Sequence, residues 1–130
     1  MDIDSEKQAE QLAQIFANLS AAVDRYRFDH WATITDDKRQ QLKIQAQVLA
    51  MRSQQCTADA LGSILLSIQP HLPNIEKATQ DAQDTLATLK DVAKALAIVD
   101  AAVSLVYSIA ACDLGSLGSG LDGLTRAIEG

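Results

Sequence analysis

Aromatic residues make up only 4% of this 130-residue chain, which also has just six glycines and two prolines. A β-sandwich or β-barrel needs many turns and favours aromatic and β-branched side chains, so this composition argues against both. Apolar residues nevertheless reach 48%, and Ala, Leu, Ile and Val supply most of them. Small and branched aliphatic residues with few helix breakers predict an all-α protein, and the length suffices for one domain with its own core.

Basic residues are also few, with 11 Lys and Arg against 17 Asp and Glu, a formal net charge of −6 and a pI of about 4.7. Phosphate backbones repel such a chain, so we expect no nucleic-acid partner. Anionic lipid head groups repel it as well, which makes a membrane partner less favoured than a protein.

Cysteine and histidine each occur only twice, as Cys56, Cys112, His30 and His71. None of them has metal-ligand spacing, so we predict neither a metal nor a cofactor. The two thiols are interpreted as small buried hydrophobic groups, with a disulfide as the alternative. The acidic N-terminus lacks the apolar run of a secretory signal, so the expected location is the cytoplasm, with export that needs no signal as the alternative.

Apolar positions with helical spacing predict an elongated up-down-up bundle of three long helices. The first helix is expected over about 5–28, with Ser5 as its cap and an inward stripe of Ala9, Leu12, Phe16, Leu19, Val23 and Tyr26. The second is expected over about 36–69, capped by Thr35 and continuous, with a split near 53–57 (where Thr57 could cap a new helix) as the alternative.

The third helix is predicted over about 75–112, because apolar positions repeat every four and three residues and Asn74 is a good cap. The repeat, which is typical of coiled coils, comprises Ile75, Thr79, Ala82, Leu86, Leu89, Ala93, Leu96, Asp100, Val103, Tyr107 and Ala110, and continues through Leu114, Leu117, Leu121, Leu124 and Ile128. Four internal glycines, at 115, 118, 120 and 123, interrupt the C-terminal segment 113–130, so a glycine-bearing turn and a short helix over 119–128 are predicted there.

The segment 95–112 is apolar on every side and carries a single charge, Asp100. A helix in a three-helix bundle keeps one face in water, so something further should cover this segment. The C-terminal segment, a second copy or another protein, or a membrane could do so. The candidate interaction surface is therefore Ile98, Val99, Val103, Leu105, Val106 and Tyr107.

Asp100 is either a polar residue that fixes helix register or a functional acid that responds to protons or to a partner. A second candidate patch combines aromatic and basic residues, the types that anchor protein interfaces. It consists of Arg25, Tyr26, Arg27, His30 and Trp31. The alternative is that Tyr26 and Trp31 plug the end of the bundle.

The chain has no motif of a catalytic or nucleotide-binding site, so it is not expected to be an enzyme. The primary hypothesis is a helical interaction protein that self-associates or holds another helical protein through the apolar face of the third helix. In composition, the region from about Leu86 to Leu124 resembles α-helical pore-forming toxins. That resemblance implies the alternative, a membrane-active protein that is soluble until triggered.

Overall fold

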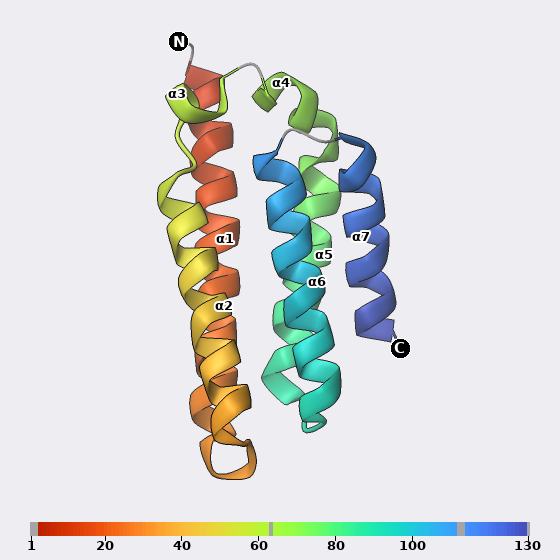
Figure 1. Cartoon of the computed structure of the whole chain (residues 1–130). Coiled ribbons are helices and arrows are strands. Elements are labelled where there is room, and N and C mark those ends of the chain that lie inside the picture. Colours follow the sequence, from red (N-terminus) through yellow and green to blue (C-terminus); the bar gives the residue numbers. More distant parts are fainter. Residues whose placement is uncertain (1–2, 63, 112–113, 130) are drawn as a thin grey trace.

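The computed structural model describes residues 3–62, 64–111 and 114–129, and all regular secondary structure in these ranges is helical (Figure 1). The all-α prediction is therefore confirmed. The elements are α1 (Ile3–Asp29), η1 (Trp31–Thr33), α2 (Asp36–Gln54), α3 (Ala58–Leu61), α4 (Ile64–Ile68), η2 (Gln69–His71), α5 (Leu72–Thr88), α6 (Val92–Ala110) and α7 (Leu114–Glu129).

The long helices α1, α2, α5 and α6 lie side by side, and α7 covers α5 and α6 (Figure 1). α1 packs on α2, α2 on α6, α5 on α6, and α1 on α5, so these four form a bundle. α7 runs along the side of the bundle and packs on both α6 and α5. The predicted three-helix, up-down-up arrangement is not what these residues form.

The first predicted helix agrees with α1, whose inward stripe is buried throughout, from Ala9 to Tyr26. The cap predicted at Ser5 is wrong, because α1 already includes Ile3. The cap at Thr35 is confirmed, since its hydroxyl accepts from the amide of Lys38 at 3.4 Å. Two acidic residues in the first turn of α2 add a favourable interaction with the helix dipole.

The second predicted helix is not continuous; the alternative, a split near 53–57, is correct. α2 ends at Gln54, and the Thr57 hydroxyl accepts from the amide of Ala60 at 3.1 Å as the next helix begins. That helix, α3, ends at Leu61 and is followed by Gly62, whose φ of +54° is the left-handed conformation that glycine adopts most readily.

The third predicted helix is two helices. α5 begins at Leu72, ahead of the predicted cap at Asn74, with Pro73 in its first turn, where proline is tolerated. It ends at Thr88, and Leu89 is extended. The Asp91 carboxylate then caps α6 by accepting from the amides of Ala93 at 3.0 Å and Lys94 at 3.3 Å. The chain reverses here, so α6 lies back alongside α5 (Figure 1).

α7 is one helix, so the predicted glycine-bearing turn and the shorter helix over 119–128 are wrong. Leu117 and Leu124 are fully or almost fully buried, and Leu121 and Ile128 are partly buried. Burial of this stripe offsets the low helix propensity of glycine. Gly120 also lets α7 approach α6 closely, because a Cβ atom there would lie 3.3 Å from the Leu105 Cα.

Candidate functional site

Most of the predicted interaction surface lies in the core. The exposed fraction is 0% for Ile98, Val99 and Leu105 and 1% for Val106. Segment 95–112 was expected to need a cover beyond the first two helices, and the C-terminal segment, one of the three covers considered, is the one that packs on α6. The reversal before α6 and the packing of α7 supply that cover.

The exposed side of α6 coincides with part of the four-three repeat expected to be buried. Its exposed residues are Ala93, Ala97, Asp100, Ser104 and Tyr107, and Ala111 directly after the helix is exposed as well. Among the predicted surface residues, Tyr107 is 45% exposed and Val103 is partly buried. The repeat predicted helical packing but assigned this stretch of α6 to the wrong side.

Two contacts fix α6 against α2 in a parallel register. The Gln45 side-chain amide donates a hydrogen bond to the Asp100 carboxylate. Seven residues further along each helix, the Arg52 guanidinium carbon lies 4.9 Å from the centre of the Tyr107 ring, which is a cation–π arrangement. Asp100 is itself exposed, so it does not carry the cost of a buried charge.

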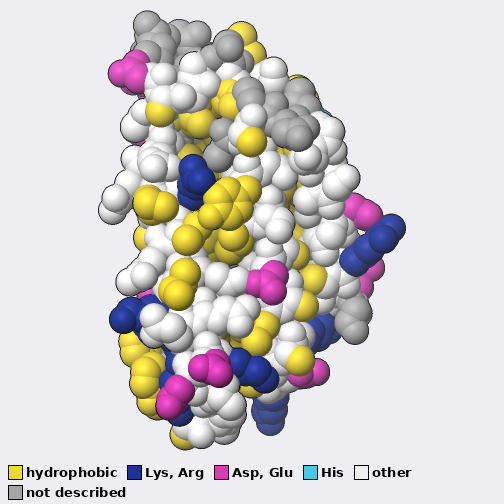
Figure 2. Space-filling view, in the orientation of Figure 1, with side chains coloured by type: hydrophobic (Ala, Val, Ile, Leu, Met, Phe, Trp, Pro, Cys, Tyr) yellow, Lys and Arg dark blue, Asp and Glu magenta, His cyan; other side chains and the backbone are white. Residues whose placement is uncertain are grey.

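An apolar surface continues from Tyr107 onto α2. Ile44 is 50% exposed and Met51 is 48% exposed, and they lie seven residues apart, so they point in similar directions from the helix. We call the surface formed by Ile44, Val48, Met51, Asp100 and Tyr107 the α2–α6 face. Figure 2 shows hydrophobic side chains gathered in the middle of the molecule over these two helices. Tyrosine, methionine and arginine are enriched at protein interfaces.

The second predicted patch is only partly on the surface. Tyr26 is 2% exposed and stacks on His30, with ring centres 4.1 Å apart. Its burial, together with the negative charge of Asp91, raises the pKa of the Tyr26 hydroxyl. Tyr26 therefore closes the bundle and cannot act as a contact residue, whereas Arg25 is exposed.

Trp31 does not plug the bundle, since it is 46% exposed. It stacks against Phe28, which is 63% exposed, with ring centres 6.1 Å apart. Arg27 lies over the Phe28 ring at 4.7 Å, and Arg39 lies over the Trp31 ring at 4.7 Å. Arg27 is also paired with Asp24 at 3.1 Å, so intramolecular contacts already engage both guanidinium groups.

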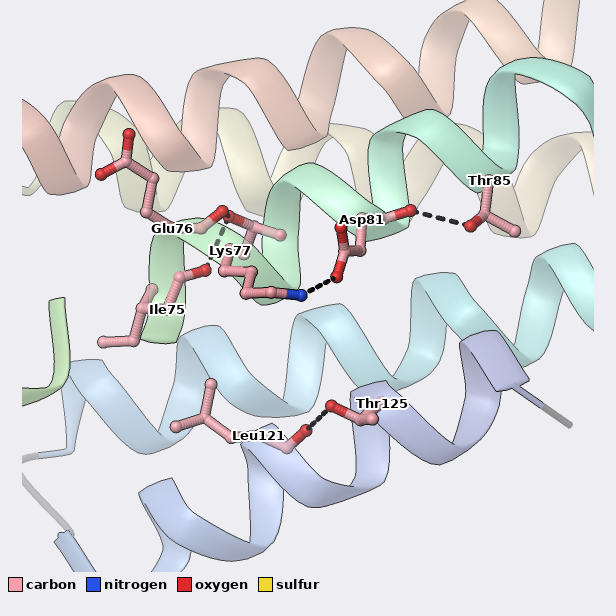
Figure 3. Close-up of polar contacts among 8 residues, drawn as sticks. Ile75, Glu76, Lys77, Asp81, Thr85, Leu121 and Thr125 are labelled. Atoms are coloured by element: carbon pink, nitrogen blue, oxygen red, sulfur yellow. Dashed lines mark hydrogen bonds and ion pairs between the residues drawn. The ribbon is translucent and has the colours of Figure 1, made fainter. Parts of the chain in front are cut away.

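A groove of about 440 Å³ lies between α5 and α7, and no pattern in the sequence indicated it. Figure 3 shows that three of its polar side chains, those of Lys77, Asp81 and Thr125, bond within their own helices. Lys77 pairs with Asp81 at 3.0 Å, and the Thr125 hydroxyl donates to the Leu121 carbonyl at 3.0 Å. These side chains therefore do not point toward a common centre, as the residues of an active site do.

Cys56 is a buried free thiol, and burial raises its pKa to about 11, against a smaller opposing effect of the nearby Arg52 charge. Cys112 lies outside the described residues. Within the described ranges, no group of three or more His, Cys, Asp and Glu side chains is placed to hold a metal ion.

One helix in the described part of the chain is long and apolar enough to cross a membrane by length and composition. The segment is Val92–Ile109 of α6, and 39% of it is buried inside the bundle. A core helix of a soluble protein meets the same criterion. No family model, no curated protein and no solved structure matches the chain.

Proposed function

We propose that this chain is a non-enzymatic helical interaction protein that associates with a second copy of itself through the α2–α6 face. The observation that carries the proposal is the exposure of Ile44, Met51 and Tyr107 on one side of two adjacent helices. Burying large apolar side chains of this kind is the main favourable term in protein association.

Charged residues on and beside the α2–α6 face support a second copy as the partner. Asp100 is paired with Gln45, and Arg52 lies seven residues further along α2, a separation of about 10 Å along a helix. A two-fold axis near Val48 would therefore bring Arg52 of one copy toward Asp100 of the other. Twofold dimers require such a self-complementary surface.

A charge-swap series measured by light scattering after size exclusion tests this arrangement. The unchanged chain should be a dimer at micromolar concentration. Arg52→Glu and Asp100→Arg should each give monomers, because each places like charges opposite one another. The double variant should dimerise again. The exposed Leu66 on α4 offers a matched control, and Leu66→Lys should stay dimeric.

A monomer at all concentrations would contradict the proposal. Dimerisation of both single variants would also contradict it. The same holds for a double variant that dimerises no more than either single variant. Far-ultraviolet circular dichroism of every variant separates lost association from lost folding.

The second candidate function is membrane activity, and the apolar segment Val92–Ile109 is the observation that favours it. Its buried side would have to leave the bundle before insertion. Release of a dye from phosphatidylcholine–phosphatidylglycerol vesicles at pH 7 and pH 5 tests this function. Leakage that increases with Asp100→Asn would favour membrane activity, because a charged residue at the bilayer centre opposes insertion. Vesicles that release no dye at either pH would contradict membrane activity.

A further inference from the structure

A cavity of about 260 Å³ lies where the chain leaves α2 and turns into α3. The break at this point carries the backbone away from the direction of α2, and the space beside it is left open. Side chains from four parts of the fold line the cavity, namely Phe16, Arg52, Gln55, Cys56, Ala60, Leu61 and Ile109. Its volume is slightly below the range of about 300–1,000 Å³ for pockets that bind drug-sized molecules, so it suits a smaller ligand.

Most of the lining is apolar. Phe16 and Ile109 are each 2% exposed, and Leu61 packs against the same core. The Cys56 thiol is 9% exposed, and with a pKa that burial raises to about 11 it is neutral near pH 7. The Arg52 guanidinium is therefore the one formal charge among the seven lining side chains.

Arg52 has an unused donor. Its Nη1 donates to Gln55 Oε1 at 3.2 Å, but its Nε–H is buried and has no acceptor in the described part of the chain. Across residues 3–62, 64–111 and 114–129, the ion pairs join other residues, and none includes Arg52. A buried charged donor without an acceptor is unfavourable, and a carboxylate is the group that a guanidinium binds best.

We propose that this cavity binds a small organic carboxylate. Its carboxylate oxygen accepts from the Arg52 Nε–H, and its short aliphatic or aromatic tail lies against Phe16, Leu61 and Ile109. This site goes beyond self-association. Arg52 is the one residue that both proposals use, so a variant that changes only the α2–α6 face distinguishes their tests.

Hexanoate and hexanol are suitable probes, because they share a tail and differ in charge. Each is titrated into the full chain while the backbone amide resonances of residues 52–61 are followed by NMR. Hexanoate should cause saturable shifts there, and hexanol should bind at least about tenfold more weakly. Arg52→Gln should reduce hexanoate affinity to that of hexanol, whereas Arg52→Lys should keep part of the preference.

Two matched variants locate the site. Ala60 is exposed at the edge of the cavity, so Ala60→Phe should fill the opening and abolish binding of both probes. Arg25→Gln removes an exposed arginine elsewhere and should leave both affinities unchanged. Ile44→Lys should still bind hexanoate, which separates this site from dimerisation.

Equal affinity for the two probes, or an unchanged hexanoate affinity in Arg52→Gln, would overturn the proposal. The absence of saturable shifts in the unchanged chain would overturn it as well.

Discussion

The two sides of α6 differ in chemistry and in their expected roles. The buried side carries Ile98, Val99, Leu105, Val106 and Ile109, all 2% exposed or less, and it packs within the chain. The exposed side carries small or polar residues and Tyr107. Stability and association therefore depend on opposite sides of the same helix, and substitutions can separate them.

The largest effect is expected on the buried side. Leu105→Ala should lower the free energy of unfolding by about 2–5 kcal/mol, because it removes buried apolar contacts and leaves a cavity. Urea denaturation followed by circular dichroism measures the change. Leu66→Ala is the control, since Leu66 is 71% exposed and its truncation should cost less than about 0.5 kcal/mol. Equal losses in the two variants would contradict the assignment of the core.

A smaller loss is expected where α6 begins. Asp91→Ala removes the carboxylate that caps the helix and should lower the free energy of unfolding by about 1 kcal/mol. The adjacent Lys90 is exposed and does not cap α6, so Lys90→Ala is the matched control. If both variants unfold at the same urea concentration as the unchanged chain, α6 does not depend on this cap.

The glycines of α7 should respond in opposite ways according to their distance from α6. A Cβ atom at Gly118 or Gly123 meets nothing within 4 Å, so alanine there should stabilise the protein by up to about 1 kcal/mol through helix propensity. At Gly120 the same Cβ would lie 3.3 Å from the Leu105 Cα and Cδ1. Gly120→Ala should therefore give less stabilisation than the other two, or a loss.

Thermal unfolding of Gly118→Ala, Gly120→Ala and Gly123→Ala under the same conditions tests this prediction. A Gly120→Ala variant as stabilised as Gly118→Ala would show that α7 does not approach α6 closely.

Hydrophobic periodicity predicted α1 well, because charged residues clearly mark its outer face and its buried stripe repeats without interruption. It could not locate the end of α5, because Leu89 continues the repeat although its backbone is extended. Neither proline nor glycine marks the reversal, and Asp91 was the local signal, since aspartate is a preferred cap. When α5 and α6 are interpreted as one helix, they cannot pack on each other. Their apolar surfaces are then assigned to some other partner.

The candidate site was predicted only in part, because the repeat assigned the exposed side of α6 to the core. Tyr107 was among the predicted surface residues, but the hydrophobic pattern assigned neither Ile44 nor Met51 to a surface, because apolar residues of a helix are ordinarily interpreted as core positions. On α6, the exposed positions Ala97, Asp100 and Ser104 were the available signal that one side faces water. The cavity beside Cys56 depends on the break after α2 and on the packing of α1, α3 and α6, so no local pattern could reveal it.

Cross-linking near the proposed two-fold axis tests self-association most directly. Ser104 is exposed on α6 midway between Asp100 and Tyr107, so Ser104→Cys, in a background with Cys56→Ala and Cys112→Ala, places a thiol near the axis. A short bismaleimide should then link two copies rapidly, whereas Leu66→Cys in the same background should remain largely unlinked. Equal cross-linking of the two variants, or none in Ser104→Cys, would contradict association through the α2–α6 face.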